Sequence, residues 1–203
     1  MTQITPNHTK LPIVLASTSP RRADLLLTAG VDFVVQAVEI DETWQPQETA
    51  LAYIERMVKQ KSLAAAPQHA SCLLITADTI GVLADGQVLT KPKDFADACR
   101  MWASLSDTTH EIWTAVCVSH VEQGKIINSQ QICERTEVDF VAISQAMQDA
   151  YWQTGEPQDK AGAYAIQGGA MAWVKAIRGS YTNVVGLPLA QTLSLIEQIQ
   201  IDK

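Results

Sequence analysis

Short apolar runs and amphipathic stripes alternate along most of this chain. Extended apolar runs predict strands over residues 13–16, 33–38, 72–76, 88–89, 111–119, 125–130, 134–141 and 171–177. Apolar residues at helical spacing predict helices over residues 20–29, 49–66, 94–104, 144–153 and 189–199. Helices alternate with strands in the first half, whereas the middle is rich in hairpins. The pattern therefore predicts an α/β fold with a mixed sheet.

The segment 11–30 predicts a strand, a hydroxyl-rich loop and a helix in close succession. Residues 17–19 are all serine or threonine, and Ser19 stands where a helix N-cap belongs. Pro20 suits the first helical position, and Gly30 suits the helix end. The loop therefore leads directly into the N-terminus of a helix.

Two arginines, Arg21 and Arg22, occupy the first turn of this predicted helix. A helix N-terminus carries free N–H groups and a partial positive charge, so cations there cost a few tenths of a kcal/mol. The pair is either two solvated arginines on a surface turn or positive charge gathered to bind an anion.

Composition predicts one folded domain, residues 11–203, after a flexible N-terminal arm of residues 1–10. The 203 residues are 47% hydrophobic and 18% charged, which is typical of a globular protein. The net charge of −7 argues against general nucleic-acid binding, which usually needs a basic face. The apolar runs are too short to span a membrane, and the polar start lacks a signal peptide, so we expect a cytoplasmic protein.

Several charged residues follow predicted strands or lie near an apolar helix face. The acidic run 39–42, which ends at Glu42, is either a solvated turn or a metal site. Lys61 lies beside the apolar stripe of its helix, where it either snorkels to solvent or reaches a site. Asp78 follows the predicted buried strand that ends at residue 76, where ligands gather in open α/β sheets. Lys91 precedes a proline that holds its backbone extended.

Carboxylates and cations gathered at strand ends and in glycine-containing loops suit a nucleoside triphosphate with a divalent metal. Basic side chains and helix N–H groups bind phosphates, and carboxylates hold Mg²⁺. The chain has no phosphate-binding glycine loop of the GxxxxGK[ST] type. The histidines at 69, 110 and 120 lack partner spacing, so we predict that they lie on the surface. The cysteines at 72, 99, 117 and 133 lack metal-ligand spacing, and we predict that they are reduced and mostly buried.

An ordered set of short motifs resembles the Maf family of nucleoside triphosphate pyrophosphatases. The set comprises ASTSPRR at 16–22, IDE at 40–42, the Lys61 helix, ADT at 77–79, KP at 91–92, TGEP at 154–157, DKAGAY at 159–164, IQG at 166–168, GSY at 179–181 and VVGLPL at 184–189. The resemblance covers nearly all of the chain after residue 10. Three family glycines are replaced, by Thr90, Asp107 and Ala165, without loss of a chemical group.

The resemblance implies hydrolysis between the α- and β-phosphates of a nucleoside triphosphate, with Mg²⁺ or Mn²⁺ as cofactor. It implies a twisted mixed sheet in two lobes with a cleft between them, and often a homodimer. By resemblance, Asp78 is the proton acceptor and Glu42 its partner at the metal. Arg22, Lys61 and Lys91 contact phosphates.

The same resemblance assigns a base preference. Ser17, Arg21, Thr79 and Gln167 are implied to bind substrate, and the last three match positions tied to base selection in the branch acting on dTTP and UTP. One alternative is the same chemistry on 7-methyl-GTP, which needs a roomier base pocket. Another is a protein that senses nucleotides, because the family is associated with septum inhibition.

Overall fold

The computed structural model describes residues 11–201, and the predicted flexible arm at 1–10 lies outside the described residues. One seven-stranded sheet has the order β2-β1-β3-β5-β6-β7, with β4 paired to β3. Its strands are β1 (Ile13–Leu15), β2 (Phe33–Val35), β3 (Ser71–Val82), β4 (Val88–Leu89), β5 (Thr109–Glu122), β6 (Lys125–Phe140) and β7 (Val174–Arg178). β1 runs parallel to β2 and β3, and the other pairs are antiparallel. The predicted α/β fold with a mixed sheet is confirmed.

In the described part of the chain, six α-helices flank the sheet. They are α1 (Pro20–Thr28), α2 (Ala50–Ala65), α3 (Phe95–Leu105), α4 (Gln145–Gln153), α5 (Tyr181–Val185) and α6 (Leu189–Ile201). Within residues 11–201 there are also four short 3₁₀ turns: Ala66–Gln68, Glu156–Asp159, Ala161–Ala163 and Gly169–Trp173.

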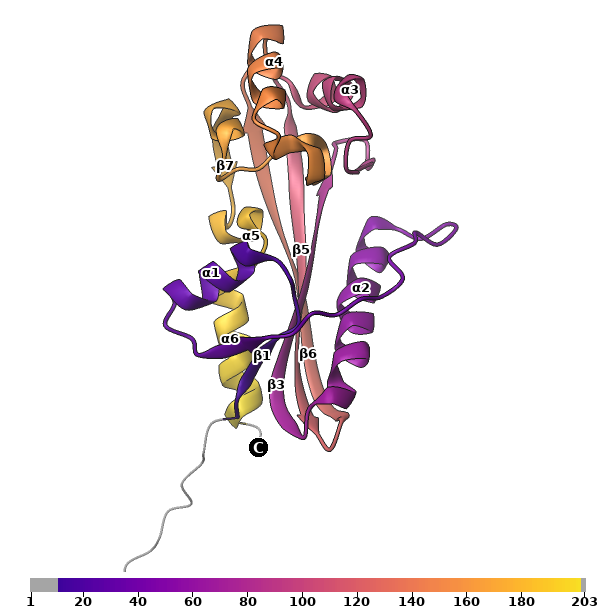
Figure 1. Cartoon of the computed structure of the whole chain (residues 1–203), viewed down its shortest axis with the longest axis vertical. Coiled ribbons are helices and arrows are strands. Elements are labelled where there is room, and N and C mark those ends of the chain that lie inside the picture. Colours follow the sequence, from indigo (N-terminus) through magenta and orange to yellow (C-terminus); the bar gives the residue numbers. More distant parts are fainter. Residues whose placement is uncertain (1–10, 202–203) are drawn as a thin grey trace, which may run out of the picture.

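The long strands β3, β5 and β6 run through two lobes (Figure 1). In the lower lobe, α1 and α6 cover one face of the sheet, and α2 covers the opposite face. In the upper lobe, α3, α4 and β7 gather around the far ends of the same strands. Each lobe has its own apolar core: Leu26, Leu73 and Ile196 belong to the lower one, and Trp102 and Phe140 to the upper one. The predicted two-lobed architecture is therefore present.

Helix starts follow the capping residues that the sequence offers. The side chains of Thr49, Asp94 and Ser144 each accept a hydrogen bond from a backbone N–H in the first turn of α2, α3 and α4. At α1 the N-cap is Ser19, as predicted, but its hydroxyl makes no capping bond. Its own N–H instead donates to the Ser17 hydroxyl at 3.2 Å.

Two strands are longer than predicted. β3 runs without a break to residue 82, so Asp78 lies within the strand and not at its end. β6 is one strand over residues 125–140, where two were predicted. The reason is the same for both strands. Each pairs with β5 along almost its whole length, and this pairing keeps segments with polar residues in the strand.

Other predicted boundaries were wrong by a few residues. β2 ends at Val35, three residues early. The first part of the predicted strand 171–177 is a 3₁₀ turn, and β7 begins at Val174. The GSY motif at 179–181 leads directly into α5, whose N-cap Ser180 accepts the Asn183 N–H.

Two predicted surface histidines are buried. His110 and His120 lie on β5, which is paired on both sides, and their exposed fractions are 1% and 7%. Cys72 and Cys117 are buried as predicted, whereas the other two cysteines are partly exposed, and all four are free. Among residues 11–201, no helix combines the length and apolar character that crossing a membrane requires.

Candidate active site

The site forms where one edge of β3 is left open. β1 pairs with β3 only as far as Ile75, and β4 pairs with it again from Gly81. Between these points, no strand of the described chain covers that edge, and Asp78 and Thr79 lie in the gap. Unpaired backbone groups at such an edge need other partners. The departure of the chain after β1 therefore creates a cleft and leaves backbone groups at this edge of β3 without a strand partner.

Arg22 provides a hydrogen-bond partner at this open edge. Its guanidinium donates to the carbonyl oxygens of Ala77 at 2.9 Å and Gly186 at 2.8 Å, and to the hydroxyls of Ser17 at 3.2 Å and Thr79 at 3.1 Å. Burial lowers the pKa of Arg22, and the nearby Asp78 carboxylate partly offsets this effect. Because an arginine carries five N–H groups, these four bonds leave one for a ligand. Arg22 thus ties α1 to the open edge of β3.

Asp78 and Thr79 point to opposite faces of the sheet, as successive residues of a strand do. Asp78 faces α2, where Lys61 Nζ donates to its Oδ1 at 2.7 Å. Thr79 faces α5, and its Oγ1 lies 2.9 Å from the Thr114 hydroxyl. The site therefore has a carboxylate on one side of β3 and a hydroxyl on the other.

Lys61 joins two carboxylates. Its Nζ lies 2.7 Å from Asp78 Oδ1 and 2.9 Å from Glu42 Oε1. Buried polar contacts position α2 for this: the Thr76 hydroxyl donates to the Val58 carbonyl oxygen at 2.9 Å and meets Ser62 Oγ at 2.9 Å. Lys61 is itself only 9% exposed, so it does not snorkel to solvent. Glu42, Lys61 and Asp78 form one carboxylate–ammonium–carboxylate group.

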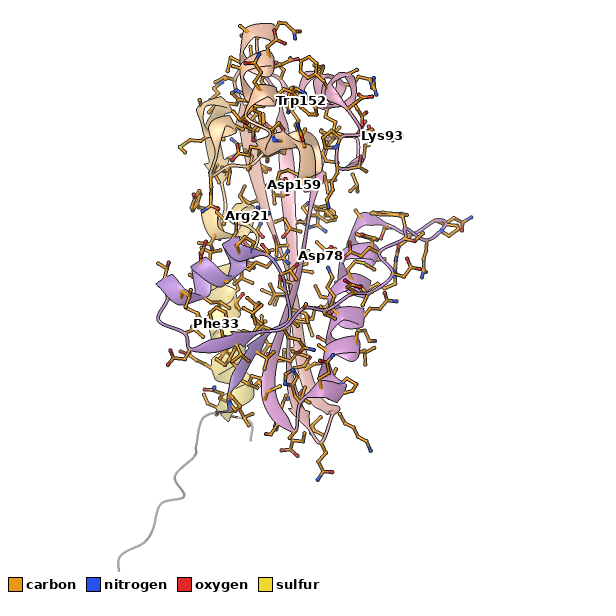
Figure 2. All side chains as sticks on the ribbon, viewed as in Figure 1. Arg21, Phe33, Asp78, Lys93, Trp152 and Asp159 are labelled. Carbon is orange, nitrogen blue, oxygen red and sulfur yellow. The ribbon has the colours of Figure 1, made fainter. Side chains whose placement is uncertain are left out.

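A cavity of about 310 Å³ lies beside this group, at the waist of the molecule. Figure 2 shows Arg21, Asp78 and Asp159 at this level, between the two lobes. The lining includes four cations, which are Arg21, Arg22, Lys91 and Lys160, and two carboxylates, which are Asp78 and Asp159. The cavity is therefore positive on balance although the chain is acidic overall.

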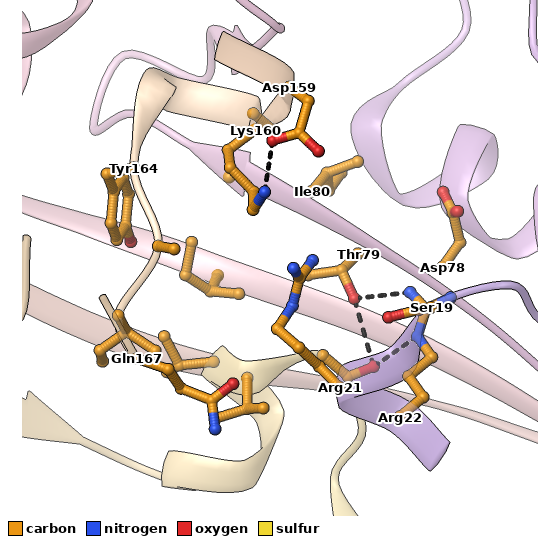
Figure 3. A pocket seen from close by; sticks show the side chains of 18 of the residues that line it. Ser19, Arg21, Arg22, Asp78, Thr79, Ile80, Asp159, Lys160, Tyr164 and Gln167 are labelled. Atoms are coloured by element: carbon orange, nitrogen blue, oxygen red, sulfur yellow. Dashed lines mark hydrogen bonds and ion pairs between the residues drawn. The ribbon is translucent and has the colours of Figure 1, made fainter. Parts of the chain in front are cut away.

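The far wall of the cavity comes from the upper lobe. Tyr164 and Gln167 line it opposite Arg21 (Figure 3). Lys160 pairs with Asp159 at the rim, and this contact lowers the pKa of Asp159. A second hollow, on the Ser17 side of Arg21, is lined by Glu42 and Lys61. A ligand spanning both hollows would meet the cations, the carboxylate pair and Gln167.

All nine predicted site residues line one of these two adjoining hollows. The first contains Arg21, Arg22, Asp78, Thr79, Lys91 and Gln167, and the second contains Ser17, Arg21, Arg22, Glu42 and Lys61. The structure therefore places the nine residues close together, and their individual roles remain predictions.

The sequence reasoning did not include Tyr164 among the site residues. Tyr164 is buried, and its hydroxyl lies 2.7 Å from His110 Nε2. Burial raises its pKa, so the hydroxyl remains protonated. Its position in a glycine-bearing loop was the available signal. What the sequence did not reveal was the buried histidine that holds it.

Comparison with known proteins identifies the family. A family model described as Maf-like protein matches residues 12–199. The chain belongs to the Maf-like family. Two Psychrobacter proteins named dTTP/UTP pyrophosphatase are similar to it. The protein from P. cryohalolentis is 47% identical, covering 93% of this chain and 97% of that protein, and the one from P. arcticus is 48% identical, covering 93% and 95%. A protein of the same name from Acinetobacter baylyi is 41% identical, covering 92% and 98%.

This Maf-like chain has donors that fit a divalent metal. Asp78 and Glu42 converge on one point, the Lys61 ammonium, and carboxylate oxygens are the ligands that Mg²⁺ prefers. Within residues 11–201, no group of three or more histidine, cysteine, aspartate or glutamate side chains is placed to hold a metal. Mg²⁺ usually keeps several waters and takes one or two carboxylates plus substrate phosphates, so two carboxylates are sufficient.

Proposed function

We propose that this protein hydrolyses dTTP and UTP to the nucleoside monophosphate and pyrophosphate. The observation that carries the proposal is the juxtaposition of the Lys61-bridged carboxylates with a cationic cavity that has an exposed glutamine in its far wall. Family membership and the names of the similar proteins support the same activity.

The proposed binding mode uses the cations and the glutamine at different ends of the substrate. Lys91 and the remaining N–H of Arg22 bind the triphosphate, because charge-assisted hydrogen bonds to phosphate are strong. Gln167 pairs with the base, since its amide offers an acceptor and two donors to the O4 and N3–H edge of thymine or uracil. Such pairing discriminates against bases that leave the amide unsatisfied.

The proposed chemical step is the attack of water on the α-phosphorus. Asp78 orients the water and accepts its proton as the new P–O bond forms, and the bond from the α-phosphorus to the bridging oxygen breaks. Pyrophosphate leaves with that bridging oxygen. Lys61 holds the Asp78 carboxylate toward the cavity, and Glu42 shares its ammonium.

We propose Mg²⁺ or Mn²⁺ as the cofactor, held by Glu42 and Asp78. A bound divalent ion would supply charge neutralisation at the phosphates and a more acidic water. The cytoplasmic location and the homodimer stay predictions.

A substrate panel tests the proposed function. Pyrophosphate release is measured with Mg²⁺ and each of dTTP, UTP, dCTP, dGTP, dATP and 7-methyl-GTP. We expect the two 4-oxopyrimidine nucleotides, dTTP and UTP, to have the highest kcat/KM. A preference for 7-methyl-GTP would overturn the base assignment. Nucleotide binding without turnover in the presence of either metal would instead indicate a sensing protein.

A further inference from the structure

The turn that carries Gln167 is held by a tyrosine outside the cavity. Residues 165–168 form a tight turn, in which the Gly168 N–H donates to the Ala165 carbonyl oxygen at 3.1 Å. Ala165 N–H donates to the Tyr151 hydroxyl on α4 at 3.0 Å. The Gln167 side chain is exposed and forms no hydrogen bond with another residue in the described part of the chain. Its direction therefore depends on the backbone of the turn.

A glutamate holds the other end of the same turn. Gly169 N–H donates to Glu156 Oε2 at 3.0 Å. A Cβ atom on Gly168 would lie 1.8 Å from Glu156 Oε1, so a larger residue there would displace the Glu156 carboxylate from the turn. Burial raises the pKa of Tyr151, and the neighbouring Glu156 adds to the shift. Tyr151 and Glu156 thus each accept a backbone N–H at one end of the turn.

We propose that Tyr151 and Glu156 are positioning residues that set base selectivity by fixing the turn of Gln167. This inference rests on the proposed function, in which Gln167 reads the base. Neither residue is among those that line the cavity, so neither contacts the substrate there. The physical reason is geometric: hydrogen bonds weaken steeply once distance and angle leave a narrow range, so a small movement of the turn costs the preferred base its pairing.

Two variants that remove one contact each test the proposal. In Tyr151→Phe, the Ala165 N–H loses its acceptor, and in Glu156→Ala, the Gly169 N–H does. We expect each to lower the ratio of kcat/KM for dTTP over dGTP by about three- to tenfold, the worth of one typical hydrogen bond. Glu156→Gln keeps an acceptor oxygen and should restore most of the ratio.

Asp85→Ala is the matched control. Asp85 also accepts a backbone N–H, from Gln87 at 2.9 Å, but it lies in the turn between β3 and β4 and does not line the cavity. Its loss should leave the ratio of kcat/KM unchanged.

A double-mutant cycle separates positioning from general stability. In a Gln167→Ala background, adding Glu156→Ala or Tyr151→Phe should change the ratio no further, whereas their effects on melting temperature should persist. A further fall of the ratio in that background would overturn the proposal, because the effect would not act through Gln167.

The single variants distinguish the remaining outcomes. If Gln167→Ala lowers the ratio but both Glu156→Ala and Tyr151→Phe leave it unchanged, the positioning role is wrong and base reading by Gln167 stands. If Gln167→Ala leaves the ratio unchanged, base reading by Gln167 and the positioning role both fail. Should Glu156→Ala not fold, Tyr151→Phe, which deletes only a hydroxyl, decides between these results.

Discussion

Asp78 is the residue on which the proposed chemistry depends. It lies within β3, on the face toward α2, and shares the Lys61 ammonium with Glu42. Its position beside an open strand edge gives its carboxylate access to the cavity. The contact with Lys61 fixes its orientation before any substrate arrives.

Replacing Asp78 by asparagine removes the charge and the basicity while keeping the size. We expect kcat to fall by about 10²- to 10⁴-fold, the usual worth of a general base. The melting temperature should change little, because Lys61 retains Glu42 as its partner. Turnover and thermal unfolding are measured on the same preparation, with Asp85→Asn as a surface control. Near-normal turnover with a lowered melting temperature would mean that Asp78 is structural.

At this scale the sequence predicted residue identities better than contacts. Asp78 was found because it follows an apolar run, and Arg21 because it begins a helix after a hydroxyl-rich loop. The bridge from Lys61 to two carboxylates was beyond prediction, since it depends on how α2 lies across β3. The carbonyl partners of Arg22 depend in the same way on where β1 leaves the sheet.

Among the secondary-structure elements, the open edge of β3 organises the site. β1 and β4 cover its two ends and leave the middle to Arg22, which reaches over from α1. The same guanidinium reaches Gly186, after α5, so it holds three segments of the chain together. A residue expected to contact phosphate therefore also stabilises the fold.

Arg22→Ala should lower both activity and stability. The four lost hydrogen bonds involve a charged group, and we expect a loss of roughly 2–4 kcal/mol in the free energy of unfolding. For a protein of this size, that corresponds to a fall of about 10 °C in melting temperature. Arg21→Ala is the matched control, because Arg21 lines the cavity but forms no hydrogen bond or ion pair with the rest of residues 11–201. Equal melting temperatures for the two variants would refute this stabilising role of Arg22.

Elements set by local interactions were predicted better than elements set by long-range pairing. Helix starts at Thr49, Asp94 and Ser144 were predicted correctly because a cap is a local interaction. The full lengths of β3 and β6 were not, because pairing with β5 is a long-range interaction that local composition does not reveal.

At the scale of the whole molecule, a buried pair in the upper lobe supports the cavity wall. His110 belongs to β5, which runs through both lobes, and its Nε2 lies 2.7 Å from the hydroxyl of Tyr164 in the cavity wall. Burial lowers the pKa of His110 to about 4, with Asp139 partly opposing the shift. The imidazole therefore stays neutral in the folded protein at neutral pH.

This pKa predicts a loss of stability in acid. In the unfolded chain, His110 has an ordinary pKa of about 6.5. Between the folded and unfolded pKa values, the unfolded state therefore binds a proton that the folded state does not bind. The free energy of unfolding is unaffected by protonation of His110 above about pH 6.5. It falls as the pH falls toward 4, by up to about 3 kcal/mol. Denaturant unfolding across this range should show a smaller acid loss in His110→Gln than in the unmodified protein. Parallel curves would contradict the low pKa.

The position of bond cleavage tests the central claim most directly. The unmodified protein is given dTTP and Mg²⁺ in water enriched in ¹⁸O, and the products are separated and weighed by mass spectrometry. Attack on the α-phosphorus predicts one ¹⁸O atom in dTMP and none in pyrophosphate. Label in pyrophosphate would place the attack on the β-phosphorus, and formation of dTDP with labelled orthophosphate would place it on the γ-phosphorus; either result contradicts the account.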